Sequence, residues 1–417
     1  MKHLLYCFFF SLIYSSGRTQ HMNIPNYTLP DVLASNNGTA IKTSADWENK
    51  RRQEILELFA QHVQGKTPQK KIESRIVLRD KNTNALNGRA TRKQVRIYFG
   101  GDDKHHFDLL IYLPNQSKKK VPVFLGLNFS GNQTVHSDPG IFISDRWVRY
   151  GKEPEYVNNV ATNASRGIET DQWSVEKILS AGYGLVTMYY GDLQPDSSNS
   201  AGAGIAPLFY KPGQMTPESN EWGAIGVWAW ALSRAMDFLE KEKAVDAKKV
   251  AVIGHSRLGK TALWAGAQDK RFAMVISNNS GEGGAAITRR KYGETSAVMN
   301  KSFPHWFSAN YKKFDDKEDE LPVDYHELIA LIAPRPVYIA SASEDQWADP
   351  TGEYLGGYHA GKVYALYSLK GLETENPPPA NQPVGDGHIG YHMRQGIHDI
   401  TPYDWDQYIR FADRFFK

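Results

Sequence analysis

Cysteine is almost absent from this sequence, which contains only one, Cys7, among 417 residues. That residue lies in an N-terminal segment, 2–17, that is first basic, then apolar, and finally small and polar. This order is typical of an export signal, so we predict a signal peptide over residues 1–20 and a secreted or periplasmic protein. Loss of Cys7 with this segment would exclude disulfides, thiolate metal sites and cysteine catalysis from the mature chain. A buried strand, or a lipoprotein anchor at Cys7, is the alternative interpretation of the segment.

An excess of charge of one sign is also lacking. The 49 basic and 46 acidic side chains are spread along the chain and give a formal net charge of +3. We therefore expect no basic face suited to nucleic acid. Long apolar runs are missing too: the N-terminal apolar stretch is too short to span a bilayer, so no stable membrane insertion is expected. Because 41% of the residues are hydrophobic, the chain can still build one large core.

Short apolar runs alternate with segments of helical periodicity, which is typical of a parallel sheet covered by helices. The predicted strands are 94–99, 107–112, 122–127, 184–190, 250–253, 273–277 and 337–342, and the predicted helices are 45–65, 223–239, 258–266 and 403–416. We expect residues 21–44 to form an exposed lead-in and residues 45–417 a single domain. Two segments, 131–173 and 283–321, are longer than ordinary loops and are predicted to form lids or cleft walls.

One strand-to-helix junction carries the pattern of a catalytic nucleophile. Residues 248–260, KKVAVIGHSRLGK, run from a strand through Gly254 and Ser256 into a helix. A serine in such a tight turn is exposed above the sheet edge, where the N-terminus of the following helix favours developing negative charge. The second glycine, Gly259, falls one position later than the G-x-S-x-G pattern requires. An N-cap serine at an ordinary junction is the alternative interpretation.

A serine nucleophile needs a histidine base, and that base needs a carboxylate to orient it. Behind a nucleophile of this kind the acid follows a later strand, and the histidine precedes the last helix. Asp345 and His398 satisfy this order. We therefore predict a Ser256, His398 and Asp345 triad on an α/β-hydrolase fold, a three-layer sandwich with a mostly parallel central sheet. His388 and His392 remain candidates for the base.

Further short segments are specific in combination, although each is weak alone. They are YYGD at 189–192 with PD at 195–196, WGAIGVWAW at 222–230, GHSRLGK at 254–260, SG at 280–281 with GG at 283–284, FPHW at 303–306, HEL at 326–328 with APRP at 333–336, and DQWADP at 345–350. From about Ile76 onward the chain thereby resembles the glucuronoyl esterases, a carbohydrate esterase family, and especially its bacterial members. The resemblance implies hydrolysis of the ester between (4-O-methyl-)glucuronic acid of xylan and an alcohol such as a lignin alcohol. The family pattern G-x-S-R-x-G-K also accounts for the position of Gly259.

The resemblance implies roles for individual side chains. Arg257 would reach over the developing oxyanion, where a guanidinium is a suitable donor because it keeps its proton. Lys260 and Glu294 would bind sugar hydroxyls, and Trp347 would close on the same sugar. Trp306 would line the xylan side of the cleft. A structural role, as an ion-pair partner, surface charge or packing residue, is the alternative for each of them.

The chain departs from the fungal members of the family at one position. Where those place a catalytic Glu, after the strand 273–277, this chain has Asn278 and Asn279, and an amide cannot stabilise an imidazolium by its charge. Some bacterial members resemble this chain in the location of Asp345, which is therefore the predicted acid. Glu282 is the alternative acid.

These residues predict two-step acyl transfer without a metal or organic cofactor. The histidines do not show zinc spacing, because His326-Glu327 lacks the second histidine of H-E-x-x-H. The expected substrate is glucuronoxylan or a lignin–carbohydrate ester, and the chain is expected to be a monomer. An acetylxylan or feruloyl esterase, a non-catalytic xylan-binding protein, and a peptidase on the same scaffold are the alternatives.

Overall fold

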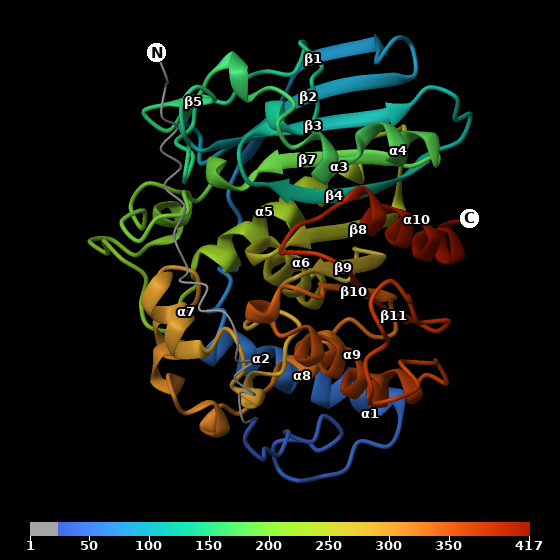
Figure 1. The fold of residues 1–417 in the computed structure, drawn as a ribbon. Helices are drawn as coiled ribbons and strands as arrows, with labels where there is room; N and C mark the ends of the chain where they lie inside the picture. Colours follow the sequence, from blue (N-terminus) through green and yellow to red (C-terminus); the bar gives the residue numbers. More distant parts are fainter. Residues whose placement is uncertain (1–23) are drawn as a thin grey trace, which may run out of the picture.

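A nine-stranded sheet forms the centre of the molecule, in the order β1-β2-β3-β7-β4-β8-β9-β10-β11 (Figure 1). The computed structural model describes residues 24–417, so the predicted signal peptide with Cys7 lies outside the described residues. The strands are β1 (Ser74–Ala85), β2 (Ala90–Phe99), β3 (His106–Pro114), β4 (Val121–Asn128), β7 (Gly184–Tyr189), β8 (Val245–His255), β9 (Met274–Asn278), β10 (Val337–Ala342) and β11 (Ile389–Arg394). Pairing is antiparallel from β1 to β7 and parallel from β7 to β11.

The central strands are apolar on both faces, as expected for strands covered by helices on both sides. Along β4, Val123 and Leu125 belong to one core cluster and Phe124 to the other. β8 repeats this alternation with Val250 and Ala251. Because side chains alternate along a strand, each run of apolar residues supplies two cores. Every strand predicted from the sequence is confirmed. β1 and β11 were not predicted, and neither was a separate two-stranded sheet of β5 (Tyr156–Val157) and β6 (Val160–Ala161).

Helices cover both faces of the sheet (Figure 1). The first core cluster lies under α2, α5, α6, α8 and α9, and the second lies under α4 and α10. The helices are α1 (Ser44–Asp46), α2 (Arg52–His62), α3 (Thr170–Trp173), α4 (Val175–Ser180), α5 (Ala224–Leu239), α6 (Arg257–Gln268), α7 (Ser296–Ser302), α8 (Tyr325–Ala330), α9 (Pro350–Ala365) and α10 (Pro402–Phe416). A π-helical turn, Trp47–Arg51, joins α1 to α2 within the first predicted helix. The layers are those of the predicted α/β-hydrolase fold.

Residues 24–43 are less exposed than predicted. Val32 and Ile41 are buried in the main core, and Ala34 forms an isolated β-bridge with Ala40. The prediction of an exposed lead-in is therefore wrong at these buried positions, because the stretch closes one edge of the core.

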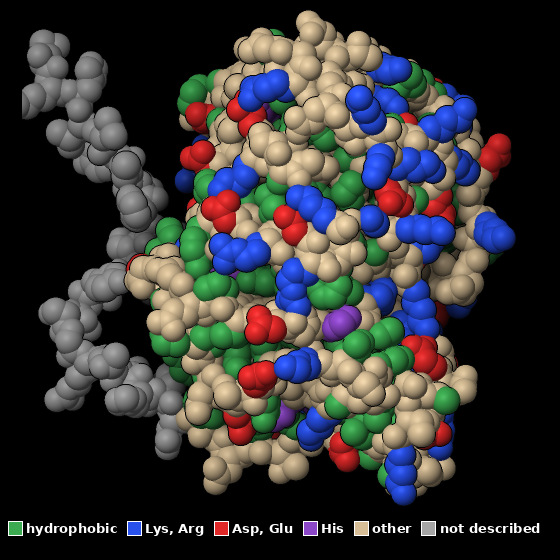
Figure 2. All heavy atoms as spheres, turned by 90° about the vertical axis from the view of Figure 1, so that its right-hand side faces the viewer, with side chains coloured by type: hydrophobic (Ala, Val, Ile, Leu, Met, Phe, Trp, Pro, Cys, Tyr) green, Lys and Arg blue, Asp and Glu red, His purple; other side chains and the backbone are tan. Residues whose placement is uncertain are grey.

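Charged side chains are scattered over the face seen from the side of α10 and the C-terminus. Figure 2 shows Lys and Arg side chains across this face, with acidic side chains between them. Within residues 24–417 no helix combines the length and the apolar character needed to cross a membrane.

Candidate active site

The predicted elbow is present where β8 ends and α6 begins. Ser256, between them, has φ 57° and ψ −130°, a strained backbone for a residue with a side chain and one that suits a nucleophile elbow. Its N–H donates to the carbonyl of Asn278 at the end of β9, at 2.9 Å. The N–H of Gly259 already donates to the Ser256 carbonyl at 2.8 Å. The N–H groups of Arg257 and Leu258, at the start of α6, have no intrahelical acceptor and are available at this corner. Ser256 is half-buried, and the local geometry is suited to a reactive hydroxyl.

Two glycines allow this tight corner. A Cβ on Gly254 would collide with the carbonyl of Leu258. A Cβ on Gly259 would meet the carbonyl oxygen of Asn278 at 3.1 Å and the Cβ of Ser280 at 3.0 Å. Gly259 thus lets α6 approach the chain that leaves β9, which explains physically why the second glycine stands one position later than in the common pattern.

The predicted base and acid lie together beside the elbow. His398, in the loop between β11 and α10, is hydrogen-bonded through Nδ1 to Oδ2 of Asp345 at 2.6 Å. Its ring centroid lies 4.6 Å from that of His255, the residue immediately before Ser256. The His398 side chain is 41% exposed. Engagement of Nδ1 by the carboxylate leaves Nε2 for the reacting groups.

Asp345 has a second partner that was not predicted from the sequence. The side-chain amide of Asn279 donates to the same Oδ2 at 2.8 Å. Burial opposes ionisation of Asp345, but the bond and charge of His398 and the bond from Asn279 together lower its pKa below the ordinary value. Asn279, one of the two asparagines that follow the strand predicted at 273–277, is therefore a donor to the acid. Its position directly after a strand end was the only signal.

The alternative base and acid candidates are engaged elsewhere. His392 is buried in β11 and is paired with Asp404 at 2.8 Å. His388 packs against an aromatic ring of α10. Glu282 accepts a hydrogen bond from the Tyr311 hydroxyl, and burial raises the pKa of Glu282 to about 8. Asp345, and not Glu282, is the carboxylate bonded to His398.

Arg257 is fixed by a buried carboxylate. Its Nη1 lies 3.2 Å from Oδ2 of Asp196, and its guanidinium lies over the rings of Phe129 and Trp306 at 5.2 and 5.1 Å. Asp196 also accepts from Nε2 of His305 and from Nε1 of Trp306, each at 2.7 Å. Burial opposes ionisation of Asp196, but these donors and the charge of Arg257 lower its pKa. Asp196 lies in a segment that carried the family resemblance, but its role was not predicted.

Three residues predicted to bind a sugar form one polar chain. Nζ of Lys260 donates to Oε2 of Glu294 at 3.0 Å and to the carbonyl of Ser280 at 2.5 Å. Oε1 of Glu294 accepts from Nε1 of Trp347 at 2.9 Å. Lys260 is only 2% exposed, so it is not a surface charge, whereas Trp347 is 54% exposed. The structure therefore brings the three side chains together, and the indole of Trp347 is the exposed member.

Trp306 is less available than its predicted role requires. It is 3% exposed, and its ring is stacked on Phe303 with centroids 3.8 Å apart. Its indole N–H is bonded to Asp196. In this structure Trp306 supports Arg257 by packing, and a contact with substrate stays a prediction.

Comparisons with known proteins identify the family of the chain. A family model described as glucuronyl esterase, fungi, matches residues 161–368. Carbohydrate esterase MZ0003, from an unknown prokaryotic organism, is 50% identical over 392 residues, which are 94% of this chain and 90% of that protein. 4-O-methyl-glucuronoyl methylesterase 1 of Wolfiporia cocos is 28% identical over 348 residues, with 79% of this chain and 71% of that protein covered.

A solved structure gives the same result. The glucuronoyl esterase from Solibacter usitatus matches with a TM-score of 0.90 and 49% sequence identity, over 95% of this chain and 100% of that chain. Sequence and structure therefore show that the chain belongs to the glucuronoyl esterase family, carbohydrate esterase family 15.

Proposed function

We propose that this enzyme is a carboxylic ester hydrolase that cleaves the ester between (4-O-methyl-)glucuronic acid of glucuronoxylan and an alcohol. The observation that carries the proposal is the 2.6 Å bond between His398 and Asp345, with the His398 ring packed beside the elbow of Ser256. This arrangement supports nucleophilic acyl transfer. The printed names of the relatives support the glucuronoyl group as the acyl part of the substrate.

The proposed reaction has two steps. Nε2 of His398 takes the proton of the Ser256 hydroxyl, and the serine oxygen attacks the uronate carbonyl carbon. The tetrahedral oxyanion accepts bonds from Arg257 and from amides at the start of α6, and its collapse expels the alcohol, which His398 protonates. Water, deprotonated by His398, then attacks the acyl-enzyme and releases free glucuronate and Ser256.

The proton transfer requires one contact that forms with substrate. In the described part of the chain, the His398 imidazole is hydrogen-bonded to Asp345 and not to the Ser256 hydroxyl. Catalytic hydrogen bonds are often long without substrate and shorten in the Michaelis complex. We therefore expect the bond between Nε2 of His398 and the Ser256 hydroxyl to form when substrate binds.

Sugar recognition favours a glucuronoyl ester over an acetyl or feruloyl ester. Lys260, Glu294 and Trp347 combine a cation, a carboxylate and an indole next to the helix that starts at Ser256. Such groups match the hydroxyls and the apolar face of a sugar, and they have no evident partner on an acetyl group. We also propose export of the protein, on the basis of the N-terminal segment 2–17.

Replacement of the nucleophile tests the proposal. Ser256→Ala should lower the turnover of a benzyl glucuronate ester by at least about 1,000-fold, since the acyl-enzyme cannot form. Ser117→Ala, in the exposed loop before β4, is the matched control and should keep full activity. The same preparations should be tested on acetylated xylan. Retained activity of Ser256→Ala, or faster turnover of acetylated xylan than of the glucuronate ester, would contradict the proposal.

A further inference from the structure

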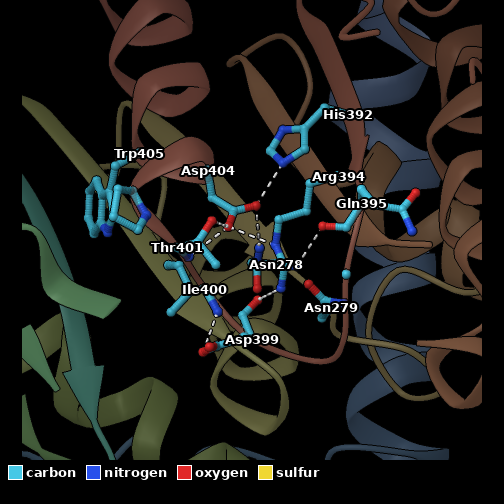
Figure 3. Close-up of polar contacts among 12 residues, drawn as sticks. Asn278, Asn279, His392, Arg394, Gln395, Asp399, Ile400, Thr401, Asp404 and Trp405 are labelled. Atoms are coloured by element: carbon cyan, nitrogen blue, oxygen red, sulfur yellow. Dashed lines mark hydrogen bonds and ion pairs between the residues drawn. The ribbon is translucent and has the colours of Figure 1, made fainter. Parts of the chain in front are cut away.

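A buried carboxylate lies beneath both the loop of His398 and the elbow of Ser256. Asp404, in the first turn of α10, is completely buried. Its oxygens accept from Nε2 of His392 at 2.8 Å, from Nε of Arg394 at 3.0 Å, and from the backbone N–H and hydroxyl of Thr401 at 2.7 Å each (Figure 3). A carboxylate with this many donors is held in one orientation.

Arg394 extends this centre to the backbone on both sides of His398. It is the last residue of β11, and its side chain is 5% exposed. From Nη2 it donates to the carbonyl of Ile397 at 2.6 Å and to the carbonyl of Asp399 at 2.8 Å. Figure 3 shows the Arg394 side chain directed between Asp404 and this loop. One planar guanidinium therefore binds the residues immediately before and after the proposed base.

The same carboxylate reaches the elbow through Asn278. Nδ2 of Asn278 lies 3.4 Å from Oδ1 of Asp404. Figure 3 shows the two side chains facing each other. Oδ1 of Asn278 is bonded to Nδ1 of His255 at 2.5 Å, and its backbone carbonyl accepts from the N–H of Ser256 at 2.9 Å. The elbow and the His398 loop come from distant parts of the chain, and this network links them.

We propose that Arg394 and Asp404 are a positioning pair that fixes the backbone of His398 relative to Ser256. This inference rests on the proposed role of His398 as the base. A buried ion pair adds little net stability compared with apolar residues, so stability alone is a weak reason for its presence here. Placement of an acid–base group is demanding, because a displacement of about 1 Å can lower a rate by about 100-fold. The His398 side chain is 41% exposed, so the bonds to its flanking carbonyls restrain it in addition to the bond with Asp345.

The test is Arg394→Lys, which keeps the charge but cannot reach Asp404 and both loop carbonyls at once. Arg289→Lys is the matched control. Arg289 is a buried arginine 3.2 Å from the buried carboxylate of Asp324, and it donates to the carbonyls of Val323 and Leu321 at 3.0 and 2.6 Å. We expect Arg394→Lys to lower kcat for a glucuronate ester by about 10- to 100-fold with KM nearly unchanged. Arg289→Lys should keep kcat within about 3-fold.

A double variant separates positioning from a merely structural role. If Arg394 acts through His398, then Arg394→Lys should not lower the residual rate of His398→Ala any further. An equal loss in both backgrounds, or a wild-type kcat for Arg394→Lys at temperatures where it is folded, would overturn the inference. Failure of the proposed function is distinguishable, because His398→Ala alone would then keep its activity.

Discussion

One carboxylate oxygen of Asp345, Oδ2, lies 2.6 Å from Nδ1 of His398 and 2.8 Å from Nδ2 of Asn279. The histidine is thus oriented by a charged partner, and that partner is oriented by a neutral amide. Asn279, directly after β9, donates to an acid that directly follows the turn after β10.

Exchange of the acid should affect turnover and not binding. Asp345→Asn keeps the shape of the side chain but removes the charge that stabilises an imidazolium, so we expect kcat to fall by about 100- to 10,000-fold. KM for the glucuronate ester should change little. Glu282→Gln is the control, because Glu282 is bonded to Tyr311 and is not bonded to His398. Steady-state kinetics check both, and a larger loss for Glu282→Gln would identify Glu282 as the acid.

Removal of the carboxylate behind Arg257 should weaken oxyanion stabilisation. Asp196→Asn leaves Arg257 without its buried counter-charge, and we expect kcat to fall by about 10- to 100-fold. Arg257→Met should cost more, about 100- to 1,000-fold, because it removes the donor itself. Circular dichroism should show that both variants are folded. Unchanged kcat for folded Arg257→Met would show that the guanidinium does not contact the transition state.

Sugar recognition can be separated from chemistry at Glu294. Glu294→Gln weakens the charge-assisted bonds to Lys260 and Trp347, so kcat/KM for a glucuronate ester should fall by about 10-fold or more. Hydrolysis of p-nitrophenyl acetate, which has no sugar, should stay within about 2-fold. Glu344→Gln, an exposed neighbour of the acid, is the matched control. Equal losses on both esters would place Glu294 in the general scaffold of the site.

The pH dependence of stability should carry the signature of Glu353. This residue is fully buried in α9, accepts from the backbone N–H groups of Ser280 and Gly281, and has its pKa raised by burial to about 8. The unfolded chain loses this proton near the ordinary value of 4.5, so the stability that the protonated side chain provides is lost as pH rises from about 4.5 to 8.

Glu353→Gln should therefore make the free energy of unfolding less dependent on pH in this window. Titration of Glu353 changes the free energy of unfolding by at most about 1.4 kcal/mol per pH unit. Denaturant unfolding at pH 5, 6, 7 and 8 measures the slope. Glu373→Gln is the control. The Glu373 side chain is 79% exposed, so this substitution should leave the slope unchanged. An identical slope for Glu353→Gln and wild type would show that Glu353 is ionised in the folded protein.

Features that depend on neighbouring residues in the chain could be predicted from the sequence. The central strands were predicted because both of their faces are apolar, and the elbow because Gly254, Ser256 and Gly259 stand within six residues. Helix α9 was missed because four glycines interrupt its pattern. One of them, Gly356, is required by packing, since a Cβ there would collide with the carbonyl of Ala285.

Other parts of the site depend on contacts between distant residues. Asp196 and Arg257 are 61 positions apart, and Asn279 and Asp345 are 66 apart, so neither pair has a local signal. Strand β11 was missed because it carries the polar residues His392 and Arg394, whose burial depends on their partner Asp404 in α10. Buried polar residues need hydrogen-bond partners, and the sequence alone does not show which distant residues supply them.

Covalent labelling of the nucleophile tests the reaction most directly. A fluorophosphonate reacts with a serine that a histidine activates, and peptide mass spectrometry locates the adduct. We predict one adduct, on Ser256, together with complete loss of glucuronoyl ester hydrolysis, and labelling at least about 100-fold slower in His398→Ala. An adduct on another residue with Ser256 unmodified, or full hydrolytic activity after stoichiometric labelling of Ser256, would contradict the assignment of Ser256 as the nucleophile.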